Sequence, residues 1–173
     1  MDERVAGTAD IEPMAFVNGA TDFAWAAAAL HELPNRHAAG PTYLLMAHAI
    51  ELALKGYLRL QGLSTAELAR PPYGHDLGAL YTECLSSGFC CPVEKRLDVA
   101  NVIELLHKSN RSQGLRYFTW ESQWPPELTW GVEVVQSVVA LVKVAALQRD
   151  PNAGTPGPAV KLIVTIGQPQ QRD

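Results

Sequence analysis

The strongest structural signal in the chain is AHAIELALKGYLRLQG, residues 47–62, together with GHDLGALY, residues 74–81. Apolar side chains recur at three- and four-residue steps at Tyr43, Ala47, Ile50, Leu54, Tyr57 and Leu58. This spacing predicts an amphipathic helix over about Tyr43 to Leu60, with one face against a core. Gly62 follows at a position suited to ending that helix.

Four further helices are predicted before and after this one. They run over about Pro13–Leu33, His75–Ser86, Val93–His107 and Glu127–Arg149. The helix over Val93–His107 is expected to bury its apolar residues, which include Leu97, Val102 and Ile103. Ser64 is expected to cap a short helical turn that ends at Leu68.

These elements predict an all-α protein, a bundle of about four to five helices. An irregular aromatic connection, about Ser109 to Thr129, precedes the last helix. Residues 1–12 and 151–173 are predicted to be flexible, with the helical domain at 13–150. The last helix is apolar nearly all round, which predicts burial on one side and a homodimer interface on another.

Length and composition indicate a single globular domain inside the cell. The chain has 173 residues, 47% of them hydrophobic, and a formal net charge of −4. This acidic balance provides no overall field for nucleic acid, so any RNA or nucleotide contact is expected to be local. Three cysteines without zinc-like spacing, an acidic N-terminal stretch and charged residues within the last helix favour a cytoplasmic protein without a membrane span.

Three short motifs occur in the order that a known family uses. They are Glu51-x3-Lys55 in an apolar helix, Gly74-His75-Asp76-Leu77 at a helix start, and the later pair Arg116-Tyr117. In these three motifs and their order, the chain resembles the HEPN family of small helical bundle proteins. The resemblance implies a ligand-binding surface, on which cations hold phosphate and a tyrosine stacks, formed by Glu51, Lys55, His75, Asp76, Arg116 and Tyr117.

The resemblance also bears on catalysis, because many HEPN proteins are metal-independent ribonucleases. Their mark is an arginine that is followed, after four to six intervening residues, by a histidine. Only Arg70 and His75 match this spacing, and Pro71-Pro72 directly after the arginine prevents ordinary helical presentation. The resemblance therefore implies a non-catalytic binding role towards RNA, a nucleotide or a partner protein such as a nucleotidyltransferase, in a toxin–antitoxin or defence system.

Two other functions stay open at the level of sequence. One is a ribonuclease in which His75 acts on the ribose 2′-hydroxyl and Arg70 stabilises the developing phosphate charge. The other is a structural dimerisation module without a nucleic-acid ligand.

Simpler structural roles compete with the binding role of the same residues. Glu51 and Lys55 have the favourable orientation of an exposed helix pair, worth about 0.2–0.5 kcal/mol. His75 and Asp76 most simply belong to a helix start, where Asp76 bonds free backbone amides. Both interpretations change if these side chains face a common groove with Arg116.

No metal or other cofactor is predicted. His48 and Glu51 share a helix face, and Glu83 and Glu104 belong to other predicted helices. A carboxylate-bridged metal site needs more inward carboxylates and paired Glu-x-x-His elements than the chain has. These four side chains are therefore expected to be solvated.

Overall fold

The structure, a computed structural model, describes residues 10–33, 39–111 and 126–150. Within these ranges every regular element is helical, which confirms the all-α prediction. The elements are α1 (Pro13–His31), α2 (Ala39–Leu60), α3 (Thr65–Leu68), α4 (Leu77–Ser86), η1 (Val93–Lys95), α5 (Arg96–Arg111) and α7 (Leu128–Arg149).

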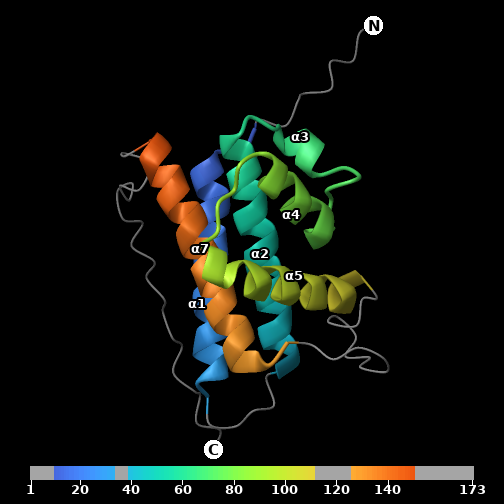
Figure 1. Cartoon of the computed structure of the whole chain (residues 1–173), viewed down its shortest axis with the longest axis vertical. Coiled ribbons are helices and arrows are strands. Elements are labelled where there is room, and N and C mark those ends of the chain that lie inside the picture. Colours follow the sequence, from blue (N-terminus) through green and yellow to red (C-terminus); the bar gives the residue numbers. More distant parts are fainter. Residues whose placement is uncertain (1–9, 34–38, 112–125, 151–173) are drawn as a thin grey trace, which may run out of the picture.

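The three longest helices, α1, α2 and α7, lie side by side and pack against one another (Figure 1). The shorter helices α4 and α5 cover a further side of α2 and contact each other, with α5 running across the long helices. Helix α2 is therefore central, because it contacts α1, α4, α5 and α7. Its side chains are the best placed to be buried.

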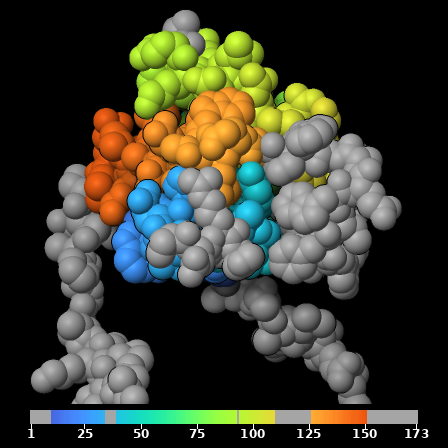
Figure 2. Space-filling view, turned by 90° about the horizontal axis from the view of Figure 1, so that it is seen from below, coloured from blue at the N-terminus to red at the C-terminus, as the bar shows by residue number. Residues whose placement is uncertain are grey.

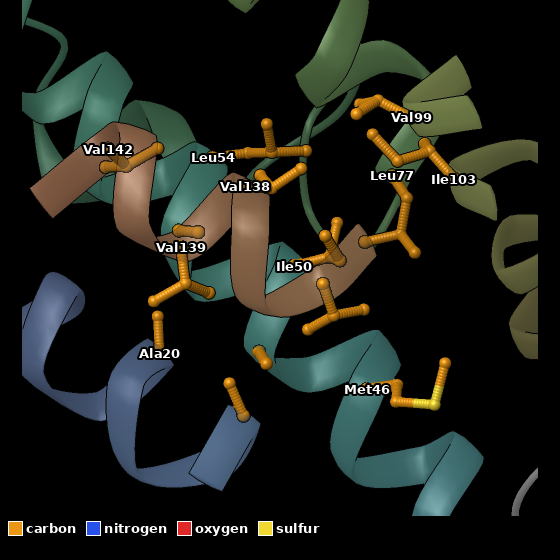
Figure 3. Close-up of a cluster of buried hydrophobic side chains, with 14 of the residues drawn as sticks. Ala20, Met46, Ile50, Leu54, Leu77, Val99, Ile103, Val138, Val139 and Val142 are labelled. Atoms are coloured by element: carbon orange, nitrogen blue, oxygen red, sulfur yellow. The ribbon is translucent and has the colours of Figure 1, made fainter. Parts of the chain in front are cut away.

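The core forms where α2 meets its neighbours (Figure 3). Side chains from five helices converge there, including Ala20, Met46, Ile50, Leu54, Leu77, Val99, Ile103, Val138, Val139 and Val142. Gly56 brings α1 and α2 unusually close. A Cβ atom at Gly56 would lie 3.2 Å from both Phe16 Cβ and Val17 Cγ2.

Local capping explains where several helices begin and end. The Ser64 hydroxyl accepts a hydrogen bond from the Glu67 N–H, and the Glu67 carboxylate accepts one from the Ser64 N–H. This reciprocal arrangement confirms the predicted cap of α3. Gly62 follows the end of α2 with φ of 103°, a conformation that glycine adopts without steric cost.

Helix α7 packs against both α1 and α2, so much of its apolar surface is covered within the chain. Its buried residues are Gly131, Val132, Val134, Val135, Val138, Val139, Val142 and Ala146. Val144 remains 53% exposed on another face. Homodimerisation through this helix stays a prediction.

Among the described residues, α7 is also the one helix long and apolar enough to cross a membrane, a test that core helices pass as well.

The first turns of α7 lie next to the end of α1 and the start of α2 (Figure 2). Two contacts hold them there. The Tyr43 hydroxyl donates a hydrogen bond to the Pro126 carbonyl at 2.6 Å, and Thr129 Oγ1 lies 3.2 Å from His31 Nε2. Burial raises the pKa of the Tyr43 hydroxyl, which favours its neutral, donating form.

Several predicted boundaries are wrong for physical reasons. Helix α2 begins at Ala39, because Pro41 falls in the first turn, where its missing N–H has no helical partner to lose. Helix α4 begins at Leu77, two residues later than predicted, since Asp76 is its cap. Helix α5 continues to Arg111, so the irregular connection does not begin at Ser109.

One further expectation needs revision. Leu97 is 71% exposed rather than buried, although Val102 and Ile103 of the same helix are buried as predicted. Within the predicted flexible N-terminus, Asp10 and Ile11 are hydrogen-bonded to Thr65. Residues 1–9 and the predicted tail, 151–173, lie outside the described residues.

Candidate functional site

The Glu51–Lys55 pair lies inside the bundle. Glu51 is 5% exposed and Lys55 is 8% exposed, and Lys55 Nζ lies 2.7 Å from Glu51 Oε1. Four-residue spacing on α2 brings the two side chains together on one face. The interpretation as an exposed helix pair is therefore wrong for both residues. So is the expectation that Glu51 is solvated.

His75 reaches the same carboxylate from the turn before α4. Its Nδ1 atom lies 3.0 Å from Glu51 Oε1 and 3.2 Å from Glu51 Oε2. Carboxylate oxygens only accept hydrogen bonds, so Nδ1 carries the proton in this contact. Gly74, with φ of 40°, lies in the turn that presents His75. Two motifs that are 24 residues apart thus meet at Glu51.

Asp76 has a structural role at the start of α4. Its Oδ1 atom accepts a hydrogen bond from the Ala79 N–H at 2.8 Å, which confirms the predicted capping role. The same oxygen lies 3.6 Å from His107 Nδ1 on α5. That nitrogen is buried without a hydrogen-bond partner among the described residues. His107 is therefore a neighbour of Asp76 that the motif analysis missed.

A cavity of about 290 Å³ adjoins Glu51 and His75. Its described lining consists of Phe23, Leu44, Leu45, Ala47, His48, Glu51 and His75. The walls are thus mainly apolar, and the polar groups come from one carboxylate and two imidazoles. The rings of Phe23 and His48 meet edge to face with centroids 4.4 Å apart. Such a volume lies near the lower end of the range that small-molecule sites occupy.

The other predicted site residues do not join this group in the described structure. Asp76 and Lys55 are not among the described lining residues of the cavity, although Lys55 bonds Glu51. Arg116 and Tyr117 lie outside the described residues. Arg70 lines a different cavity, with neighbours that include Tyr73 and Glu83.

Phe23 and His48 are the lining residues that motif analysis did not assign to a ligand site. Phe23 comes from α1 and has no motif around it, so its sequence resembles that of any core aromatic. His48 is three residues before Glu51, a spacing that places both on one helix face. In the sequence, that spacing indicates only a possible pair of metal ligands. Within the described ranges, no three His, Cys, Asp or Glu side chains are grouped to hold a metal ion.

The three cysteines are free thiols. Cys84 is buried in the core, and its thiol donates a hydrogen bond to the Leu54 carbonyl oxygen at 3.5 Å. Burial strongly raises the pKa of the Cys84 thiol, and desolvation also raises that of Cys91. Both are thereby kept in the unreactive thiol form.

The chemistry of the cavity favours recognition of a ligand that donates hydrogen bonds. Glu51 is a lining residue whose carboxylate accepts hydrogen bonds, and the apolar side chains exclude water from one side of a bound molecule. A comparison of the chain with models of protein families, with curated proteins and with solved structures found no match.

Proposed function

We propose that this chain is a HEPN-like, non-catalytic binding protein that takes the base of a nucleotide, free or within RNA, in the cavity beside Glu51. The observation that carries the proposal is the contact between Glu51 and His75 at that cavity. The Glu51 and His75 motifs come from separate parts of the HEPN-like pattern. Their meeting at a ligand-sized cavity supports a shared binding role.

The walls of the cavity suit a flat heterocycle. Phe23, Leu44 and Leu45 offer apolar and aromatic contact for the faces of a base. Glu51 and His48 offer hydrogen-bonding groups for its edge. The chain as a whole is acidic, so phosphate binding has to come from local cations. In the HEPN-like pattern that role falls to Arg116, with Tyr117 as a stacking partner.

A binding role is favoured over ribonuclease chemistry. Arg70 and His75 are the only pair with the required spacing, and they line different cavities. No hydrogen bond or ion pair joins their side chains in the described structure. A general base and a phosphate-stabilising cation have to reach the same phosphodiester, which requires them to converge.

The proposal is tested by blocking the cavity. Leu44 and Leu85 are both exposed leucines, but Leu44 lines the cavity and Leu85 does not. Binding of the four ribonucleoside monophosphates and of a mixed single-stranded RNA is measured by calorimetry and filter retention. Leu44→Trp is expected to weaken binding by about tenfold or more, because the indole fills the volume a base would occupy. Leu85→Trp is expected to bind as the parent does.

The outcomes separate the open functions. Equal binding by the parent and Leu44→Trp would remove the cavity as the site. If neither nucleotide nor RNA binds the parent, the proposal fails, and a protein-partner or dimerisation role takes its place. RNA integrity is followed in the same samples. Cleavage that is lost in His75→Ala would establish the ribonuclease alternative instead.

A further inference from the structure

His75 holds an unusual position relative to the Glu51 carboxylate. Its Nδ1–H is nearly equidistant from the two oxygens, at 3.0 Å and 3.2 Å. A donor so placed is within hydrogen-bonding distance of both oxygens, the same two atoms that a two-pronged ligand would use. Lys55 Nζ, by contrast, contacts Oε1 alone. The imidazole thus competes with a bidentate ligand for both oxygens.

The two partners differ greatly in exposure. The His75 side chain is 72% exposed, whereas the Glu51 side chain is 7% exposed. An exposed imidazole that turns away regains its hydrogen bond from water. A buried carboxylate cannot do so, and the loss of its partner is costly unless another donor replaces it. Displacement of His75 therefore requires a ligand that itself donates to Glu51.

We propose that His75 is a displaceable occupant of this site and that the ligand replacing it is a guanine base, which binds Glu51 through its adjacent N1–H and N2–H groups. This inference rests on the proposed nucleotide-binding function. It adds the identity of the base and the step by which the base enters the cavity.

The charge balance argues for a neutral donor pair. Lys55 already compensates the charge of Glu51 at 2.7 Å, so a guanidinium or amine would add an uncompensated cation to a mainly apolar cavity. Guanine supplies two parallel N–H donors without net charge. Its ring faces would lie against apolar side chains that include Phe23 and Leu45.

The other bases present the wrong edge to a carboxylate. Adenine and cytosine each place an acceptor nitrogen beside their amino group, and uracil flanks its single N–H with two carbonyl oxygens. An acceptor turned towards Glu51 would leave both groups without a donor in a desolvated position. Inosine monophosphate, which lacks the 2-amino group, keeps only one of the two donors. The expected order of affinity is therefore GMP, then IMP, then AMP.

Calorimetric titration of the full chain with GMP, IMP and AMP tests the inference. GMP is expected to bind about tenfold to a hundredfold more tightly than AMP. The reason is that GMP donates a hydrogen bond to the charged carboxylate where AMP turns an acceptor nitrogen towards it. The variant His75→Ala lacks the imidazole that competes for Glu51. It is expected to bind GMP several-fold more tightly than the parent and to bind AMP equally well. Glu51→Gln is expected to abolish the preference for GMP, because an amide offers one acceptor and one donor.

Folding is controlled with a second variant. Glu51→Gln leaves Lys55 without its charged partner, so Glu51→Leu/Lys55→Met, which removes both charges, is tested beside it. A folded double variant, judged by its circular dichroism melt, is expected to lose the preference for GMP as well.

Each remaining outcome overturns a defined part of the inference. Equal affinity for GMP and AMP would overturn guanine selection and leave the proposed function intact. Weaker GMP binding in His75→Ala would show that His75 contacts the ligand, which overturns the displacement step. Binding of none of the three nucleotides, together with no retention of RNA, would overturn the proposed function itself.

Discussion

At the scale of single residues, Glu51 and Lys55 form an ion pair that is almost fully withdrawn from water. The two charges lose hydration on folding and recover part of that loss from each other. Lys55→Ala removes one of them and leaves a buried carboxylate with reduced compensation. We expect it to lower the free energy of unfolding by about 3–5 kcal/mol, measured by chemical denaturation. Replacement of both charges by apolar groups in Glu51→Leu/Lys55→Met is expected to cost far less.

An exposed pair with the same spacing provides the control. Glu104 and Lys108 lie four residues apart on α5 and form an ion pair at the surface. Lys108→Ala is expected to change stability little, because water replaces the lost partner. Equal costs for Lys55→Ala and the double variant would contradict the account, since both would then report lost packing rather than an uncompensated charge.

The same pair shows what could be predicted about the site. The spacing of Glu51 and Lys55 is visible in the sequence, and it predicts correctly that the side chains meet. Their burial is not visible, because it depends on how the other helices pack against α2. The contact from His75 is likewise tertiary, made across 24 residues by a turn whose direction no local pattern specifies. The motifs therefore identify the three groups that bond one another, Glu51, Lys55 and His75, but not the cavity, Phe23 or the role of His48.

At the scale of helices, the close approach of α1 and α2 depends on a missing side chain. A Cβ atom at Gly56 would lie 3.2 Å from Val17 Cγ2 and 3.5 Å from the Val17 backbone nitrogen. Gly56→Val adds two methyl groups beyond that Cβ. We expect it to lower the free energy of unfolding by about 1–3 kcal/mol or more, because the helices have to separate. Ala140→Val, at an exposed position of α7, introduces the same side chain without this contact and is expected to cost less. Because valine is a better helix former than glycine and a poorer one than alanine, a loss in Gly56→Val no larger than that in Ala140→Val would contradict the close-contact explanation.

Helix positions were more predictable than helix ends. Long apolar periodicity predicts α2 and α7, and capping residues predict α3, because both signals are local in the chain. The predicted starts of α2 and α4 are wrong because Pro41 is placed in a turn and His75 in a helix. Periodicity predicts that Leu97 faces the core, yet Leu97 lies in the first turn of α5, where it is 71% exposed. These errors arise because periodicity weakens in the few residues at each helix end.

At the scale of the whole molecule, the stability of the fold depends on pH through carboxylates that accept hydrogen bonds at the starts of helices. The N–H groups of Trp130 and Thr129 at the start of α7 hold the pKa of Glu127 below its ordinary value of 4.5. Hydrogen bonds from Ser64 do the same for Glu67 at α3. The Thr65 N–H lowers the pKa of Asp10, which connects the N-terminal segment to that helix.

The direction of these shifts determines where stability is lost. A carboxylate whose pKa is lower in the folded state contributes its full stabilisation above the unfolded pKa. The contribution falls as the pH drops below about 4.5 towards the folded value, because the unfolded chain then binds more protons. The unfolding temperature is therefore expected to decrease from pH 5 to pH 3, as measured by circular dichroism.

Glu127→Gln lacks one of these protonation steps. Its unfolding temperature is therefore expected to be lower than that of the parent at pH 7 and to decrease less on acidification. Glu133→Gln, an exposed change of equal charge in the second turn of α7, separates the capping effect from the change in net charge. If Glu127→Gln followed the parent curve in parallel, the start of α7 would not be among the groups that make the bundle acid-sensitive.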